Sequence, residues 1–301
     1  MIELKNEKIA IPVVLFAGLL WSFGPLVVRY MDQPGLVPWQ YIFARGLTIF
    51  LLINLYLYFE EGINFYKNYL KIGRSGFIGG IGLGIAMITF IYSITNTSAS
   101  ITLLCLAAMP FFTALLGFLF LKEKISFNVW LAIIIAAIGM AIIASGNTEK
   151  NSLIGLIFGI TSSIGFSIFS VTLRWRKETP KFTTVAVAGL FCAIFSAIFI
   201  FINKSSFFST SYNEALFSMH GTLVCLGLIL YSIGSKAIPA AELTLLSLTE
   251  VIGGIFWVWL PTFGINEIPS NNTIIGGFFI FMSIIYYSLT IKTNRRFIAL
   301  N

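Results

Sequence analysis

The sequence predicts an all-α polytopic membrane protein, and three observations carry this prediction. Hydrophobic residues make up 57% of the 301 residues, charged residues make up only 10%, and the mean hydropathy is +0.92. Average soluble domains are about 45–50% apolar and about 25% charged. The apolar residues also form continuous runs, unlike the alternating strands of about ten residues in a membrane β-barrel. This composition argues against a water-soluble enzyme, a disordered chain and a nucleic-acid-binding protein.

Ten runs are apolar enough to be membrane spans, since a helix needs about 20 mostly apolar residues to cross a bilayer. The first run is too long for a signal-peptide core and precedes no cleavage site, so we expect it to remain as a span. The predicted spans are residues 9–28, 39–59, 76–95, 99–120, 128–145, 153–173, 182–202, 218–236, 240–262 and 272–291.

The basic residues predict which side of the membrane each loop faces. The net charge of +7 would suit nucleic-acid binding, but the Lys and Arg residues lie in short loops between apolar runs. This is what the positive-inside rule expects of a membrane protein. With a cytoplasmic N-terminus, the cytoplasmic segments hold most of them: Lys5, Lys8, Lys67, Lys71, Arg74, Lys122, Lys124, Arg174, Arg176, Lys177, Lys181, Lys236, Lys292, Arg295 and Arg296. The outer segments hold only Arg29, Lys150 and Lys204, so we expect both termini in the cytoplasm.

The chain repeats itself once. Tyr92-Ser93-Ile94 precedes Thr102-Leu103-Leu104-Cys105-Leu106, and Tyr231-Ser232-Ile233 precedes Thr244-Leu245-Leu246-Ser247-Leu248 in the same order. Each predicted half therefore holds five spans. Because five is odd, the second half enters the membrane from the opposite side, which is the inverted repeat of many secondary transporters.

The predicted boundaries follow from this repeat. The first half spans residues 9–145 and the second spans residues 153–291. Short cytoplasmic tails, residues 1–8 and 292–301, flank the two halves. In transporters with such repeats, the substrate site lies near the midplane of the bilayer, between the halves.

The sequence resembles the drug/metabolite transporter superfamily, in particular its EamA branch of ten-helix carriers. The stretches that carry the resemblance are Gly18–Gly24, Phe43–Arg45, Thr97–Ser100, Pro110, Leu121–Ser126, Gly139, Pro239–Glu242 and Leu245–Glu250. It departs from the pattern at Val251, where the family usually has proline, so we expect the ninth span to be straighter than the fourth. The resemblance implies alternating access without an ATPase, and substrates that range over amino acids, amines, nucleosides and other metabolites.

Three ionisable residues within or at the edge of spans are candidates for the substrate site, because each costs about 2.5–3.5 kcal/mol on insertion scales. Arg45 can clamp a carboxylate, although pairing with helix carbonyls would also explain it. Glu250 can bind an amine or carry a proton, since apolar surroundings favour its neutral form. Glu242 lies two turns before Glu250, and a first-turn carboxylate stabilised by the helix dipole explains it equally well.

Four aromatic residues are further candidates for binding substrate: Trp21, Tyr92, Tyr231 and Trp257. Aromatic faces can hold an ammonium group, and the alternative is ordinary packing. His220 is expected at the outer interface, where its predicted span begins. Glu123 and Glu267 are expected as interfacial anchors at the ends of the fourth and ninth spans. The sequence predicts no catalytic residue, metal site or cofactor.

We therefore expect a secondary transporter for a small organic metabolite, with an amino acid or related zwitterion favoured and small amines second. Proton coupling through Glu250 is part of this hypothesis. The resemblance places the chain in the inner membrane of a bacterium, as a monomer or homodimer, with the lipid bilayer and a small molecule as its partners. A membrane-embedded enzyme and a non-transporting receptor remain open as alternatives.

Overall fold

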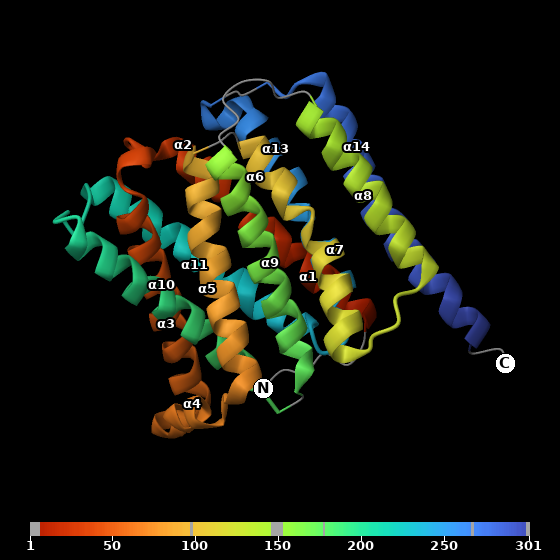
Figure 1. The fold of residues 1–301 in the computed structure, drawn as a ribbon, viewed down its shortest axis with the longest axis horizontal. Coiled ribbons are helices and arrows are strands. Elements are labelled where there is room, and N and C mark those ends of the chain that lie inside the picture. Colours follow the sequence, from red (N-terminus) through yellow and green to blue (C-terminus); the bar gives the residue numbers. More distant parts are fainter. Residues whose placement is uncertain (1–6, 97–98, 146–152, 177, 266–267, 299–301) are drawn as a thin grey trace.

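A computed structural model describes the chain except residues 1–6, 97–98, 146–152, 177, 266–267 and 299–301 (Figure 1). Lys5, Thr97, Ser98, Lys150, Lys177 and Glu267, which the sequence analysis singled out, lie outside the described residues. The described part consists of helices and their connections, with no strand. Among the described residues, seven helical segments are long and apolar enough to cross a membrane, and three shorter apolar helices accompany them. The predicted all-α polytopic membrane fold is confirmed.

The helices of the first predicted half are α1 (Glu7–Trp21), α2 (Gly24–Tyr30), α3 (Pro38–Glu61), α4 (Lys67–Lys71), α5 (Gly73–Asn96), α6 (Ala99–Leu106), α7 (Met109–Leu116) and α8 (Phe127–Ser145). Those of the second are α9 (Leu153–Trp175), α10 (Lys181–Ile202), α11 (Ser211–Gly234), α12 (Ala240–Ser247), α13 (Thr249–Trp259) and α14 (Asn271–Ile298). Short 3₁₀ turns cover Pro34–Leu36, Gly62–Tyr66 and Pro261–Phe263, and a π-helical turn covers Gly117–Leu121.

Three of the predicted spans are interrupted partway, so that each consists of two helices. The first breaks between Trp21 and Gly24, and the fourth breaks between Leu106 and Met109. A proline follows each break, Pro25 and Pro110, and proline lacks the N–H that would continue the helical hydrogen bonds. These breaks leave backbone carbonyls that must find other donors inside the membrane.

The ninth span also breaks, at Leu248, although Val251 and not a proline directly follows Glu250. The break is one residue long, against two in the fourth span, so the expected straightening is only partial. One side chain explains the break: the Thr249 hydroxyl donates to Leu15 O on α1 at 3.2 Å and to Leu246 O at 3.1 Å. Such side-chain hydrogen bonds compete with the helical pattern and bend helices.

Serines of α9 satisfy carbonyls at the break of the fourth span. The Ser163 hydroxyl donates to Cys105 O, and the Ser167 hydroxyl donates to Met109 O at 3.1 Å. One turn apart on α9, these two serines face α6 and α7 respectively. These side-chain hydrogen bonds join α9 to the interrupted span on both sides of its break, where polar backbone groups need partners in a bilayer.

Helices from the two predicted halves pack against each other. The main pairs are α5 with α9, α3 with α10, α1 with α11 and α8 with α14, and the last pair lies along one edge of the bundle (Figure 1). Small residues allow close crossing: a Cβ placed on Gly165 would stand 2.6 Å from Gly82 O. The halves are thus interleaved, and a site between them receives side chains from both.

Candidate functional site

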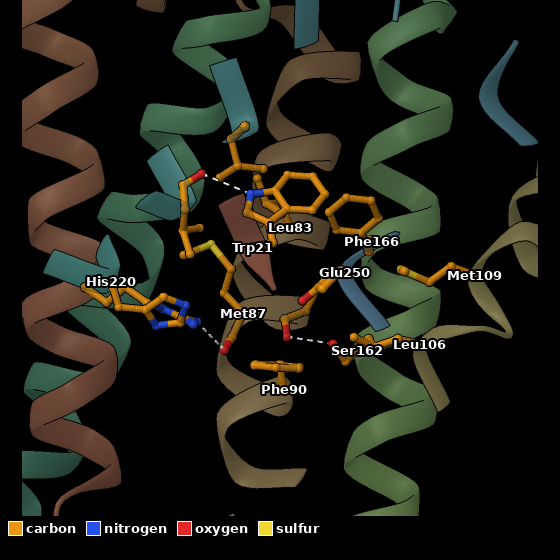
Figure 2. A pocket seen from close by; sticks show the side chains of 14 residues that line it. Trp21, Leu83, Met87, Phe90, Leu106, Met109, Ser162, Phe166, His220 and Glu250 are labelled. Carbon is orange, nitrogen blue, oxygen red and sulfur yellow. Dashed lines mark hydrogen bonds between the residues drawn. The ribbon is translucent and has the colours of Figure 1, made fainter. Parts of the chain in front are cut away.

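A pocket lies where helices of both halves meet, and its empty space, mouth included, is about 550 Å³ (Figure 2). Most of its wall is apolar. The lining residues are Trp21, Arg45, Leu83, Ala86, Met87, Phe90, Leu106, Met109, Ser162, Phe166, His220, Val224, Leu228 and Glu250.

The three helix breaks meet at this pocket. Trp21 ends α1, Leu106 ends α6, Met109 begins α7, and Glu250 is the second residue of α13. Discontinuous helices at a central site are typical of secondary transporters, because their unwound ends offer backbone polar groups and can move. The interruptions therefore lie where a carrier would use them.

Trp21 is fixed at the pocket by packing and one hydrogen bond. Its indole Nε1 donates to Val224 O at 3.2 Å, and its ring centroid lies 5.5 Å from that of Phe166 and 5.4 Å from that of Tyr231. Gly227 makes room for it, because a Cβ there would stand 2.2 Å from Nε1. The aromatic cluster closes one side of the pocket.

Arg45 is the buried cation of the site, with 3% of its surface exposed. Its Nη2 donates to Met87 O at 2.7 Å, and the guanidinium carbon lies 5.5 Å from the centroid of the Tyr41 ring. Nε is buried and has no hydrogen-bond partner among the described residues. A buried guanidinium with an unused donor is suited to binding an anionic group.

Glu250 is the acidic group of the site and is partly buried on α13. Within the described part of the chain, no hydrogen bond or ion pair to its carboxylate is present, including any with Arg45. The pocket therefore contains one cation and one carboxylate that do not neutralise each other directly. This arrangement leaves each free for a charge on a ligand.

Four predicted site residues lie away from the pocket lining. Tyr92 packs between Trp39 and Phe158, with ring centroids 4.8 and 5.4 Å away. Tyr231 is fully buried behind Trp21, and its hydroxyl lies 2.7 Å from Ser170 Oγ.

The other two lie on the ninth span. The Glu242 carboxylate accepts a hydrogen bond from the Tyr287 hydroxyl. Trp257 stacks on Phe23, with ring centroids 4.6 Å apart, and donates to Ser22 Oγ at 2.7 Å. Of the seven predicted residues, the structure thus brings Trp21, Arg45 and Glu250 together.

Two residues that were not predicted as site residues, His220 and Ser162, also line the pocket. His220 was expected at an interface because its span was predicted to begin at residue 218. The helix α11 begins at Ser211 instead, which places His220 in its third turn with 2% of its surface exposed. The spacing of His220, Val224 and Leu228, four residues apart on one helix face, is the signal that could have identified it.

A network of charges and backbone groups closes the bundle where α9 ends. Arg174 Nε donates to Glu123 Oε1 at 2.6 Å, and Arg174 Nη1 donates to Ser235 O at 2.9 Å and Ile238 O at 2.7 Å. Glu123 Oε2 also accepts from Ala240 N at 3.3 Å, at the start of α12. Glu123 thus joins the two halves and does more than the interfacial anchoring expected of it.

The backbone before Glu123 is unusual. The π-helical turn Gly117–Leu121 leads into Lys122, whose φ of 55° is left-handed. Turns of this kind are rare and occur mostly at functional positions. They aim Glu123 back at Arg174. No group of three or more His, Cys, Asp or Glu side chains among the described residues could hold a metal ion.

Comparisons with known proteins agree with this architecture. A solved crystal structure superposes with a TM-score of 0.77 at 17% sequence identity, over 95% of this chain and 98% of the other, which shows a shared fold. An uncharacterized transporter of Helicobacter pylori strain J99 is 28% identical over 177 residues, 58% of this chain. The chain matches 56% of the length of that relative.

A second relative is the pseudopaline exporter CntI of Pseudomonas aeruginosa strain UCBPP-PA14. It is 23% identical over 220 residues, which are 71% of this chain and 75% of the exporter. Residues 8–145 match the EamA-like transporter family. This part of the chain, which covers the first predicted half, is therefore similar to EamA-like transporters.

Proposed function

We propose that this chain is a secondary transporter that moves a small organic metabolite, an amino acid or a related zwitterion or amine, across the inner membrane by alternating access. The observation that carries the proposal is the pocket in which Arg45 and Glu250 stand without an ion pair between them. Holding two such charges in a membrane is costly, and a ligand with the opposite charges would offset that cost.

The chemistry of the pocket favours a zwitterion. Arg45 is suited to a carboxylate, and Glu250 is suited to an ammonium group, which the faces of Trp21 and Phe166 can also receive. The remaining wall of Leu, Met, Phe and Val side chains accommodates an apolar substituent. A nucleoside would need more uncharged hydrogen-bonding groups than this wall offers.

Proton coupling is part of the proposal. Glu250 can hold either a proton or a substrate ammonium but not both, so release of one can accompany binding of the other. The relatives that resemble this chain are named as transporters, and one of them is named as an exporter. We accordingly propose outward transport, from the side on which both termini lie.

Counterflow in proteoliposomes tests the substrate class. Vesicles preloaded with one amino acid or amine are diluted into a labelled competitor, for the wild type and for Arg45→Gln and Glu250→Gln. We expect Arg45→Gln to lose exchange of amino acids but retain exchange of amines, and Glu250→Gln to weaken both. Failure of every amino acid and amine to exchange in the wild type would refute the proposed substrate class.

A further inference from the structure

His220 is the ionisable residue of the pocket for which the proposed function has no role. It lies on α11, lines the pocket, and is 2% exposed. A histidine buried in a membrane needs partners for both ring nitrogens, or it leaves a polar group unsatisfied at a cost. The partners of the two nitrogens therefore indicate what the ring does.

Nδ1 is already occupied. The Tyr41 hydroxyl forms a hydrogen bond with it, and the Tyr41 ring stacks on Phe217 with centroids 4.9 Å apart. An unprotonated imidazole nitrogen is a better acceptor than a phenol oxygen, and the nearby Arg45 disfavours a second positive charge. We therefore assign the proton of this bond to Tyr41, which makes Nδ1 the acceptor and leaves the ring proton on Nε2.

Nε2 has no hydrogen-bond partner within the described part of the chain. Gly24 faces this atom: a Cβ added to Gly24 would stand 3.2 Å from Nε2, so the absence of a side chain at residue 24 lets the imidazole lie close to the start of α2. Arg45 also stands over Tyr41, with its Nε unpaired. Arg45 on α3 and His220 on α11 both line the pocket, and each carries an N–H group without an acceptor among the described residues.

We propose that His220 is a substrate-binding residue, whose Nε2–H donates to the same carboxylate that Arg45 binds. Tyr41 is a positioning residue: its hydroxyl fixes the imidazole tautomer, and its ring face supports the guanidinium. This assignment rests on the proposed function, because it needs a substrate that carries a carboxylate. The competing explanation is that His220 serves only to hold Tyr41 in place.

Two amide substitutions separate these explanations. The amide nitrogen of Gln can take the place of Nε2, so His220→Gln keeps the donor in the pocket and loses the bond to Tyr41. The amide of Asn takes the place of Nδ1, so His220→Asn keeps the bond to Tyr41 and loses the pocket donor. Both variants are first compared with the wild type for melting temperature and monodispersity, and transport is read as separate KM and maximal-rate values.

The probes are matched pairs that differ only by the carboxylate: L-phenylalanine with phenethylamine, and L-leucine with isopentylamine. We expect His220→Asn to raise KM for the amino acids by about tenfold, as the loss of a charge-assisted hydrogen bond implies. KM for the amines should change less than about twofold, and His220→Gln should restore most of the amino-acid affinity.

Two results would overturn the inference alone: His220→Asn behaving as the wild type while His220→Gln fails, or equal losses for amino acids and amines. The first would assign His220 the purely structural role, and the second would show that it does not recognise the carboxylate. Wild-type protein that moves none of the four probes would refute the proposed substrate class, and this inference with it. The wild-type measurement therefore distinguishes the two failures.

Discussion

Single residues decide the shape of the pocket as much as its chemistry. Trp21 reaches its position only because residue 227 lacks a side chain, and Trp21 in turn orders Phe166 and Tyr231. The depth of Trp21 in the first span made it a predicted site residue. The contact between Trp21 and Gly227 could not be predicted, because it joins residues that are far apart in the chain.

The Gly227→Ala variant tests this contact. The added methyl group would stand 2.2 Å from Trp21 Nε1, so the indole must move and lose its bond to Val224. We expect a loss of about 1–3 kcal/mol in stability, as is typical of overpacking, and a shift in tryptophan fluorescence. Gly277→Ala on α14 is the matched control, since nothing lies within 4 Å of its added Cβ. Equal melting temperatures for the two variants would contradict the prediction.

Glu250 is the residue on which proton coupling depends. Glu250→Gln keeps the size of the side chain and removes its ability to exchange a proton. We expect the rate of uptake to lose its dependence on an imposed pH gradient, measured in proteoliposomes with a fluorescent pH indicator. Glu242→Gln is the comparison, because its carboxylate is bonded to Tyr287 and lies off the pocket lining. A pH dependence that survives in Glu250→Gln would remove Glu250 from the coupling mechanism.

At the scale of helices, the sequence predicted which segments form the apolar helices, but it did not predict where each helix begins and ends. All ten predicted spans correspond to helices or helix pairs, because apolar length is a local property. The start of α11 was placed seven residues late, since Ser211–Phe217 mixes polar and apolar side chains. That error alone moved His220 from the pocket to the interface in the prediction.

The helix breaks also differ in whether the sequence could predict them. Pro25 and Pro110 are visible in the sequence, and they mark two of the three interruptions. The break at Leu248 depends on hydrogen bonds from Thr249, one of them to α1, so no local pattern could reveal it. A break that depends on a contact with a distant helix cannot be predicted from one sequence.

The Glu123–Arg174 network makes a prediction about the end of the bundle at which α9 finishes. Glu123→Gln removes the ion pair and weakens the cap on α12, while a partly exposed pair near the surface adds only about 0–1 kcal/mol to stability. We therefore expect a nearly unchanged melting temperature but several-fold faster maleimide labelling of a cysteine introduced at Ile238, which is 1% exposed. The native cysteines are buried and contribute little background.

The control is a second Glu→Gln substitution, at a glutamate outside the Glu123–Arg174 network. Glu214→Gln alters a carboxylate that accepts from Ser209 N near the start of α11, away from this network. It should leave labelling at Ile238→Cys unchanged. If Glu123→Gln also leaves that rate unchanged, the network does not hold this end closed.

At the scale of the whole molecule, the helix pairs follow the predicted two halves. The α3–α10 and α8–α14 pairs each join corresponding spans, and the α5–α9 pair corresponds to the α11–α1 pair. This pattern is what an inverted repeat would produce, and the repeat boundaries themselves remain a prediction. The pocket at the centre then draws on both halves.

The orientation of the molecule is testable with two single-cysteine variants. Glu178→Cys lies between α9 and α10, and Ser206→Cys lies between α10 and α11. Because the basic residues favour a cytoplasmic α9–α10 connection, we expect an impermeant maleimide added to intact cells to label Ser206→Cys and spare Glu178→Cys. The reverse labelling would invert the proposed orientation.

The helix α9 connects the site with the closed end of the bundle. Ser162 bonds to Ala86 O, Ser163 and Ser167 bond to α6 and α7, Ser170 bonds to Tyr231, and Arg174 bonds to Glu123. With a rise of 1.5 Å per residue, these contacts extend over about 18 Å.

Substitutions along α9 are therefore more constrained than substitutions at other positions that line the pocket. A substitution on α9 disturbs a contact with another helix, whereas Met87, Val224 and Leu228 meet the pocket through apolar side chains alone. A change of substrate range, by natural divergence or in a designed library, has its least damaging route through these three positions on α5 and α11.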